Sequence, residues 1–141
     1  MTESPEHRRL IVAGTGIAGL SAAIYAARSN NDPLVLEGVE PGGQLTLTTD
    51  VANYPGFPEG IAGPDLVNNM KEQATQFGAD VDHGVVVDVD DSTRPFAVEL
   101  RDGTRYTCDA FIAASGASAR TLGVPGEEEL MGYGLSTCAT C

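Results

Sequence analysis

Two cysteines near the carboxyl end of the chain have the spacing of a redox pair. Cys138 and Cys141 are separated only by Ala139 and Thr140. Cysteines at this spacing can close a small, strained ring that is easily reduced and easily reoxidised. The attacking thiol of such a pair needs a lowered pKa, usually from a helix N-terminus or a nearby cation, and no such cation is visible beside Cys138 in the sequence. The pair therefore predicts dithiol chemistry and leaves its activating group unidentified.

A zinc site is the alternative use of these two thiols. Zinc takes about four protein ligands in a structural site, and only Cys108, His7 and His83 remain to join the pair. Cys108 lies in a strand-like segment, where it is most simply a small buried apolar side chain. Both histidines are expected at the surface. We therefore favour redox chemistry and expect no metal site.

A glycine motif near the amino end has the pattern that suits a phosphate group. Gly14, Gly16 and Gly19 separate an apolar run, residues 10–13, from an alanine-rich segment, residues 20–28. We expect a buried parallel strand, a turn and a helix. Gly14 would allow the tight turn, Gly16 would let a pyrophosphate approach bare backbone, and Gly19 would let the helix pack close against the strand. The helix N-terminus would favour the anion through its free N–H groups and its dipole.

A carboxylate follows the second predicted strand. The apolar run over residues 33–36 ends at Glu37, where a dinucleotide-binding unit places the acid that accepts a hydrogen bond from a ribose hydroxyl. The alternative is a βαβ unit without a nucleotide, in which Glu37 is a solvated strand end. The glycine motif together with Glu37 favours the nucleotide.

The next segment, residues 38–62, shows no clear period. An irregular stretch of this length in a compact domain is usually functional or disordered, and its apolar and aromatic content argues against disorder. We interpret it as a loop wrapped along a ligand, with glycines that let backbone come close. Gln44 and Asn53 would offer amide groups to a heteroaromatic edge.

The remaining pattern predicts a parallel sheet with a small antiparallel piece. Residues 1–7 look like a frayed lead-in. Residues 63–77 are expected to form a helix with a stripe of inward-facing apolar side chains that ends at Phe77, and Gly78 is expected to stop the helix. Expected strands are residues 79–89, the hairpin 95–100 and 105–108 around Asp102–Gly103, and residues 109–114. We expect residues 1–119 to form one domain and residues 120–141 to be a connector and the start of another.

Composition restricts the partners. The formal net charge is −12, with 20 acidic residues and 8 basic ones, of which Lys71 is the only lysine. Such a surface repels nucleic acid and anionic membranes, so we exclude both as partners. Abundant acids with almost no lysine resemble proteins of a high-salt cytoplasm, the alternative being an ordinary acidic bacterial protein. No apolar run approaches the length of a membrane span and no signal peptide is visible, so we expect a cytoplasmic protein.

Six segments stand in the order and spacing seen in low-molecular-weight bacterial and archaeal thioredoxin reductases, and the chain resembles that family over nearly its whole length. The Gly-Gly-Gln-Leu and Cys-Ala-Thr-Cys segments are much more specific than the glycine fingerprint. The six segments are residues 14–19, 42–45, 53–56, 107–110, 114–120 and 136–141.

This resemblance implies an α/β fold: a Rossmann-like, three-layer ββα FAD-binding domain, incomplete here, with the start of an inserted NADPH-binding domain. It implies FAD as cofactor, thioredoxin as the disulfide partner and a homodimer in the full-length form. Cys141 would face the isoalloxazine, and Cys138 would attack the disulfide of thioredoxin. The implied cofactor contacts are Gly14, Gly16, Ile17, Ala18 and Gly19 for the pyrophosphate, Glu37 for the adenosine ribose, Gly42, Gly43, Gln44, Leu45 and Asn53 for the flavin side, the backbone of Val86 for the adenine, and Ala114, Ser115 and Gly116 closing over the dinucleotide.

The sequence also departs from that family. Ile17 stands where proline is common and Ser115 where threonine is usual, and both changes are mild because the glycines carry the geometry. The family's acid after the second cysteine, its second glycine fingerprint for NADPH and its late Gly-Asp segment are not in this sequence. We therefore expect the N-terminal half of such an enzyme, inactive alone. The alternatives are a nucleotide-binding module without turnover and a related flavin oxidoreductase that uses a different electron donor.

Overall fold

One six-stranded sheet organises the described part of the chain, which is residues 4–131 and 133–137 of this computed structural model. The strand order is β3-β2-β1-β6-β5-β4. Strands β3, β2, β1 and β6 run parallel, whereas β4, β5 and β6 are antiparallel neighbours. The strands are β1 (Glu6–Ala13), β2 (Leu34–Leu36), β3 (Asp80–Asp82), β4 (Val86–Asp90), β5 (Phe96–Leu100) and β6 (Arg105–Ala113).

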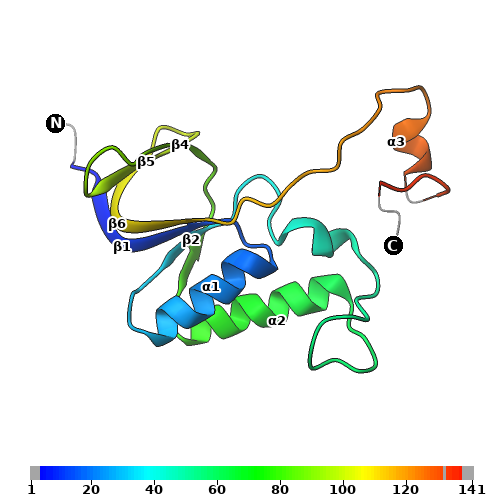
Figure 1. Ribbon diagram of the computed structural model, residues 1–141, viewed down its shortest axis with the longest axis horizontal. Helices are drawn as coiled ribbons and strands as arrows, with labels where there is room; N and C mark the ends of the chain where they lie inside the picture. The colour runs from blue at the N-terminus through cyan, green and yellow to red at the C-terminus, as the bar shows by residue number, and fades with distance from the viewer. Residues whose placement is uncertain (1–3, 132, 138–141) are drawn as a thin grey trace.

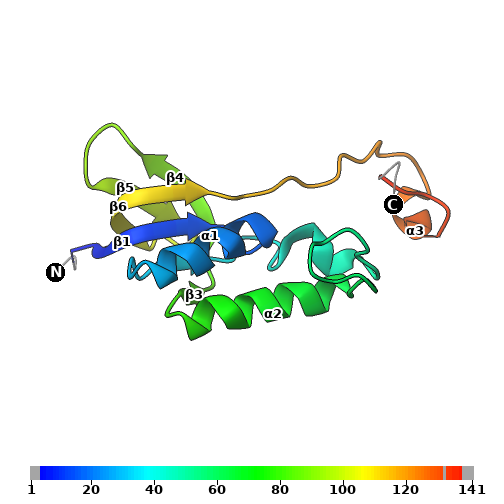
Figure 2. The same cartoon turned by 60° about the horizontal axis from the view of Figure 1, so that its bottom comes forward.

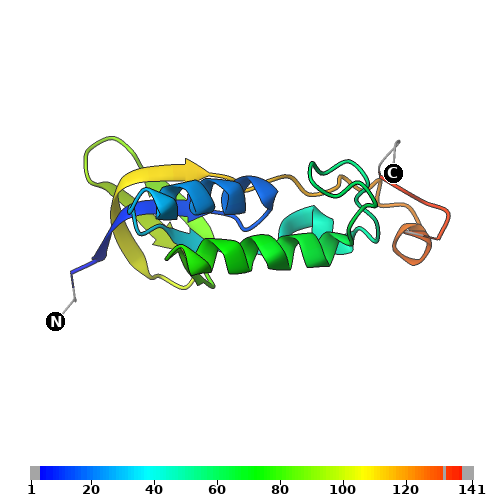
Figure 3. The same cartoon turned by 90° about the horizontal axis from the view of Figure 1, so that it is seen from below.

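Two helices cover one face of the parallel strands. Helix α1 (Ile17–Arg28) and helix α2 (Gly63–Gln76) run side by side below the sheet (Figures 1 and 3). Alternate strand residues such as Val12 and Val35 point toward them, and both are fully buried in one core cluster with Leu20 of α1 and Leu66 of α2. This packing fixes the start of α1 beside the end of β1.

The antiparallel strands cover the opposite face. Ile11 and Leu36 point away from the helices and form a second buried cluster with Val98 and Leu100 of β5. The chain is thus layered as antiparallel strands, parallel strands and helices, as Figure 2 shows. This confirms the predicted α/β, three-layer ββα fold, and it explains why β1 and β2 are apolar on both sides.

Two strand predictions were wrong in extent. β1 begins at Glu6 and not at Leu10, because the backbone of residues 6–8 pairs with β6 while the side chains remain largely exposed. Residues 105–108 and 109–114, predicted as separate strands, form the continuous strand β6, of which the first part pairs with both β1 and β5. Backbone pairing at polar positions leaves no apolar pattern in the sequence.

The predicted single strand over residues 79–89 is two strands. β3 ends at Asp82 and β4 begins at Val86, because the chain crosses from the parallel sheet to the antiparallel layer at Gly84. A Cβ at Gly84 would lie 2.8 Å from a methyl carbon of Leu100 and 2.9 Å from one of Leu36. The crossing therefore packs directly on the second core cluster, which a sequence pattern does not show.

The predicted stripe of α2 is confirmed at Leu66, Met70 and Ala74. Phe77 is a correction, because it is 45% exposed and lies against the guanidinium of Arg28 instead of the core. Gly78 has a φ of +99°, which fits the predicted helix stop.

Beyond β6 the chain leaves the sheet as an extended segment and reaches the short helix α3 (Glu127–Leu130), which stands apart from the layers in Figure 1. Within the described residues, no helix combines the length and the apolar character needed to cross a membrane. The domain boundary at residue 119 stays a prediction.

Candidate functional site

The three motif glycines have three different surroundings at the carboxyl end of β1. Gly14 has a φ of +112°, and a Cβ there would lie 2.2 Å from the carbonyl oxygen of Ala114. A Cβ on Gly19 would lie 1.9 Å from the carbonyl oxygen of Gly14, whereas one on Gly16 would meet no atom within 4 Å. The turn and the close packing of α1 thus require Gly14 and Gly19, and Gly16 presents bare backbone to open space.

The N-terminus of α1 begins at this open glycine. Gly16 is the N-cap residue, no side chain caps the helix and no acidic residue lies in its first turn. The first N–H groups of a helix have no partner within the helix, and together with the helix dipole they attract an anion. This end of α1 therefore has the donors that a pyrophosphate requires, and Ile17 and Ala18 are its first residues.

The loop that contains Gly42 and Gly43 is hydrogen-bonded to the glycine turn after β1. Thr15 is buried, and its Oγ1 accepts a hydrogen bond of 2.9 Å from the backbone N–H of Gly42. Gly42 and Gly43 both have positive φ, and a Cβ on Gly43 would lie 3.4 Å from the Cα of Gly16. The sequence analysis missed Thr15, although a hydroxyl between two motif glycines was the available signal.

The rest of the irregular segment extends the same face. Gly43 begins the short helix η1 (Gly43–Leu47), where Leu45 packs against the core and the side-chain amide of Gln44 donates to the carbonyl of Ala117. Asn53 is exposed in the loop closed by the bridge between Val51 and Ile61. The predicted flavin-side residues thus come from one loop adjoining both the glycine turn and the end of β6.

The segment after β6 meets the glycine turn through its backbone. The N–H of Ala114 donates to the carbonyl of Ala13 at 2.8 Å, and the Ala114 carbonyl faces Gly14 as described. Ser115 and Gly116 follow it and are exposed, and a Cβ on Gly116 would meet no atom within 4 Å. Ala114 therefore contacts the glycine turn, and Ser115 and Gly116 continue from it as exposed chain.

Glu37 lies at the end of β2 and is only 7% exposed. Its Oε1 lies 2.5 Å from the Nζ of Lys71, and its Oε2 lies 2.7 Å from the Nδ1 of His83. The alternative interpretation, in which Glu37 is a solvated strand end, is wrong about solvation, because the carboxylate is buried and paired. His83 is a surface residue as expected, but its contact with Glu37 and the role of Lys71 were missed because they join segments far apart in the sequence.

Val86, predicted to meet the adenine, begins β4. It follows Gly84, whose carbonyl accepts a hydrogen bond of 2.9 Å from the N–H of Gly38. Val86 is partly buried against the second core cluster. The crossing segment just before Val86 is thus hydrogen-bonded to the residue that follows Glu37.

The cysteines divide into two groups. Cys138 and Cys141 lie outside the described residues. Cys108 is fully buried in β6, and burial, aided by the nearby charge of Asp109, raises the pKa of its thiol. The Cys108 thiol is therefore protonated and shielded at neutral pH, and in the described residues no group of three or more His, Cys, Asp or Glu side chains is arranged to hold a metal ion.

A further carboxylate organises the segment that leads toward the cysteine pair. Glu127, the first residue of α3, accepts hydrogen bonds from the N–H groups of Leu122, Gly123 and Val124 at 2.8, 2.6 and 3.3 Å. These bonds hold the pKa of the Glu127 carboxyl below its ordinary value, and the bond from Leu122 contributes most to this shift. Sequence reasoning gave Glu127 no role.

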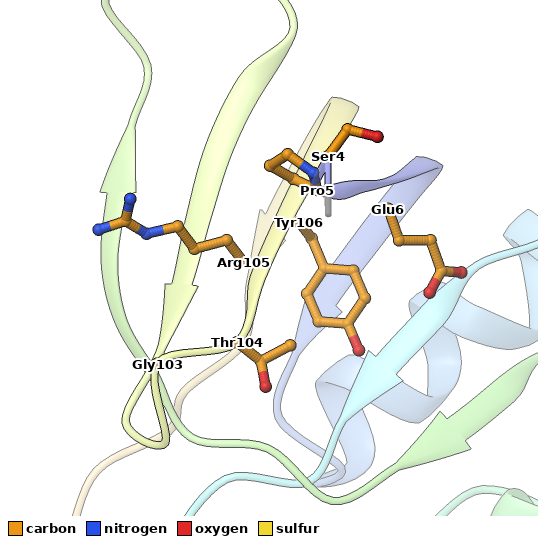
Figure 4. Close-up of a pocket in the computed structure, with 7 residues that line it drawn as sticks. All are labelled: Ser4, Pro5, Glu6, Gly103, Thr104, Arg105 and Tyr106. Carbon is orange, nitrogen blue, oxygen red and sulfur yellow. The ribbon is translucent and has the colours of Figure 1, made fainter. Parts of the chain in front are cut away.

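One cavity of the described residues lies elsewhere. It measures about 1170 Å³ and is formed at the amino ends of β1 and β6, where Figure 4 shows Tyr106 between two short segments, residues 4–6 and 103–105. Burial, and the charge of Glu6 after it, raise the pKa of the Tyr106 hydroxyl. Ligands of parallel α/β sheets bind at the carboxyl ends of the strands, so this cavity is at the wrong end of the sheet for a dinucleotide.

Comparison with known proteins places this geometry in a family. The family model described as pyridine nucleotide-disulphide oxidoreductase matches residues 8–141. The chain belongs to the pyridine nucleotide-disulphide oxidoreductase family. Within it, the chain is 50% identical over 133 residues to a thioredoxin reductase of Rickettsia bellii, a match that covers 94% of this chain and 43% of the relative. It is also 49% identical over 135 residues to a glucosaminate ammonia-lyase of Pseudomonas fluorescens, covering 96% of this chain and 42% of that protein.

Solved structures agree with the sequence relatives. The thioredoxin reductase of Streptococcus pyogenes MGAS5005 superposes with a TM-score of 0.86 at 38% identity, covering 98% of this chain and 44% of that one. This family member thus spans less than half the length of the relatives it matches. The predicted resemblance to the N-terminal part of thioredoxin reductases is confirmed.

Proposed function

We propose that the chain supplies the adenine-dinucleotide half of an FAD site and the redox-active cysteine pair of a thioredoxin-reductase-type enzyme. The observation that carries this proposal is the glycine backbone that follows the carboxyl ends of β1, β2 and β6. Gly16, Gly38 and Gly116 come from three separate segments, and a Cβ on any of them would meet no atom within 4 Å. Glycines with open space at the Cβ position suit a ligand that approaches backbone.

The residues present fit FAD. The uncapped start of α1 would hold the pyrophosphate, Glu37 would accept from the adenosine ribose, and the loop from Gly42 to Asn53 would lie along the flavin side, with the backbone near Val86 at the adenine. Ala114, Ser115 and Gly116 would close over the dinucleotide. When bound, FAD supplies a two-electron redox centre.

The cysteine pair would complete the electron path. Oxidation of the Cys138 and Cys141 thiols to a disulfide forms one S–S bond and releases two electrons and two protons. In this assignment Cys138 attacks the disulfide of a thioredoxin and Cys141 resolves the mixed disulfide. NADPH would be the electron source of the full-length form, which we expect to be a homodimer.

The glucosaminate ammonia-lyase relative makes the cysteine pair the feature to test. The name of this relative denotes an elimination, so likeness to it favours a second function in which the same dinucleotide fold serves different chemistry. Flavin binding alone does not separate the two functions, whereas the redox state of Cys138 and Cys141 does.

The experiment is an FAD titration of the purified chain, followed by absorbance and by flavin fluorescence. We expect a yellow complex with one FAD per chain. After treatment with a stoichiometric dithiol reductant, this complex should contain two more alkylatable thiols than the oxidised complex contains. Cys108→Ala is the matched control. Because Cys108 is buried and outside the pair, this variant should also gain two alkylatable thiols on reduction. A colourless chain that ignores FAD would refute the cofactor assignment, and a flavoprotein without the two-thiol difference would refute the redox pair.

NADPH is added last. We expect no bleaching of the flavin by these 141 residues alone, because the resemblance implies an NADPH site in the part of the relatives that the match does not cover. Bleaching by NADPH would contradict that expectation.

A further inference from the structure

The buried carboxylate of Glu37 is held in place from three directions. Its backbone N–H donates to the carbonyl of Asp82 in β3 at 3.1 Å, and its side chain is 93% shielded from solvent, since only 7% is exposed. A buried charge is costly unless it is paired and hydrogen-bonded. The partners of this carboxylate therefore decide whether it can stay ionised and in one orientation.

Two cationic or hydrogen-bonding side chains take one oxygen each. Lys71 reaches Oε1 from α2, and His83 reaches Oε2 from the crossing after β3, at the distances given above. A carboxylate has about four acceptor positions on its two oxygens. One partner on each oxygen leaves one position free on each, which matches the two vicinal hydroxyls of a ribose.

The residue that follows Glu37 leaves open space, and the residue that precedes it contacts the glycine turn. Gly38 has a φ of +79°, and a Cβ there would meet no atom within 4 Å. The N–H of Gly14 donates to the carbonyl of Leu36 at 2.8 Å, which ties the glycine turn to the residue just before Glu37. A ribose beside Glu37 would therefore lie next to a pyrophosphate at the start of α1.

The two partners differ in how firmly they are held. The Lys71 side chain is 43% exposed and stands on the rigid helix α2, whereas the His83 side chain is 84% exposed on a crossing segment. Lys71 is also the chain's only lysine. The stronger constraint on the carboxylate is therefore the contact with Lys71.

We propose that Lys71, assisted by His83, is a positioning residue that orients Glu37 toward the adenosine ribose and so sets the preference for a ribose with both hydroxyls. This inference rests on the proposed FAD site. Without Lys71 the Oε1 atom loses its partner, the carboxylate turns toward other donors or solvent, and the two free acceptor positions no longer face one ribose together.

The test compares two ligands, FAD and an FAD analogue whose adenosine lacks the 2′-hydroxyl. A hydrogen bond to a charged group supports a preference of about tenfold for FAD in the parent chain. Lys71→Met should reduce that preference to about twofold, and His83→Ala should give an intermediate value. Lys71→Arg, which restores a cation, should keep most of the preference.

Arg105→Met is the matched control, because it removes a cation from an exposed ion pair with Glu99 at the other end of the sheet. It should leave the preference at the parent value. Far-ultraviolet circular dichroism establishes that each variant is folded. A general loss of structure would weaken the binding of both ligands equally and would not change the ratio of the two affinities.

The outcomes separate the two proposals. Failure of the parent chain to bind FAD overturns the proposed function, and this inference with it. FAD binding by the parent with an unchanged preference in Lys71→Met overturns only the positioning role. A preference lost in Lys71→Met and not recovered in Lys71→Arg overturns the role of the cation.

Discussion

At the scale of single residues, the glycines separate into those that the fold requires and those that leave open space beside the backbone. Gly14 and Gly19 leave no room for a Cβ, while Gly16 and Gly116 leave open space. The same residue type thus serves packing at one position and access at the next. Substitution by alanine distinguishes the two uses, because it adds one methyl group and little else.

We predict different effects for Gly16→Ala and Gly19→Ala. Gly16 has a φ of −66°, which alanine adopts without strain, but alanine is a poorer N-cap residue than glycine, so Gly16→Ala should lower stability by no more than about 1 kcal/mol. It should nevertheless weaken FAD binding by about tenfold or more by filling the space beside the helix N-terminus. Gly19→Ala should destabilise the chain by about 2 kcal/mol or more, because its methyl meets the backbone of Gly14.

The measurements are urea denaturation and an FAD titration on each variant. Retained FAD affinity in Gly16→Ala, or parental stability in Gly19→Ala, would contradict this division of roles. The two variants control each other, since both replace a glycine of the same motif.

At the scale of elements, the segment between β6 and α3 depends on one carboxylate. Glu127 satisfies three backbone N–H groups that the extended segment would otherwise present to solvent. Because these bonds lower its folded-state pKa, the ionised form stabilises the segment. That contribution is complete above the ordinary carboxyl pKa of 4.5 and is lost as the pH falls through the lowered value.

We therefore predict that amide protection at Leu122, Gly123 and Val124 persists at pH 7 and disappears in acid. Glu127→Gln should already lose that protection at pH 7, because the neutral amide is a weaker acceptor than the carboxylate. Hydrogen exchange followed by NMR, corrected for the intrinsic rate at each pH, measures both effects. Glu128→Gln, at an exposed neighbour, should behave like the parent, and equal protection in both variants would refute the role of Glu127.

At the scale of the whole molecule, charge is the dominant feature. A net charge of −12 over 141 residues makes the folded state repel itself. Salt shortens the range of this repulsion from about 10 Å at 0.1 M to about 3 Å at 1 M. The expectation of a high-salt protein stays a prediction that stability measurements can decide.

We predict that the thermal midpoint rises by roughly 5 °C between 0.1 and 2 M KCl, a shift that corresponds to about 1.5 kcal/mol for a chain of this size. The control variant replaces exposed Asp91, Glu128 and Glu129 by lysine, which changes the net charge from −12 to −6 because each substitution adds two charges. Its midpoint should rise less with salt. An equal rise in both chains would show that salt acts through something other than charge screening.

Local patterns in the sequence were enough to predict the parallel sheet, its antiparallel piece and the glycine turn, whereas the three-layer arrangement was implied by the family resemblance. The apolar run, the spaced glycines and the Asp102–Gly103 hairpin each carry their own geometry within a few residues. The contacts that complete the site could not be predicted, because Lys71 and His83 reach Glu37 across distances in sequence that no period encodes. Likewise, the break at Gly84 depends on the third layer, which forms only when β5 folds over β1 and β2.

The register between β1 and β6 has a consequence for how this fold tolerates change. The two strands pair residue for residue from Glu6 with Tyr106 to Ala13 with Ala113, and that alignment alone brings Ala114 against Gly14. Deleting a single residue from either strand would turn the inward side chains outward and move Ala114 about 3 Å along the strand relative to Gly14. Length variation among homologous chains should therefore collect in the Asp102–Gly103 hairpin, at the far end of the sheet, and spare these two strands.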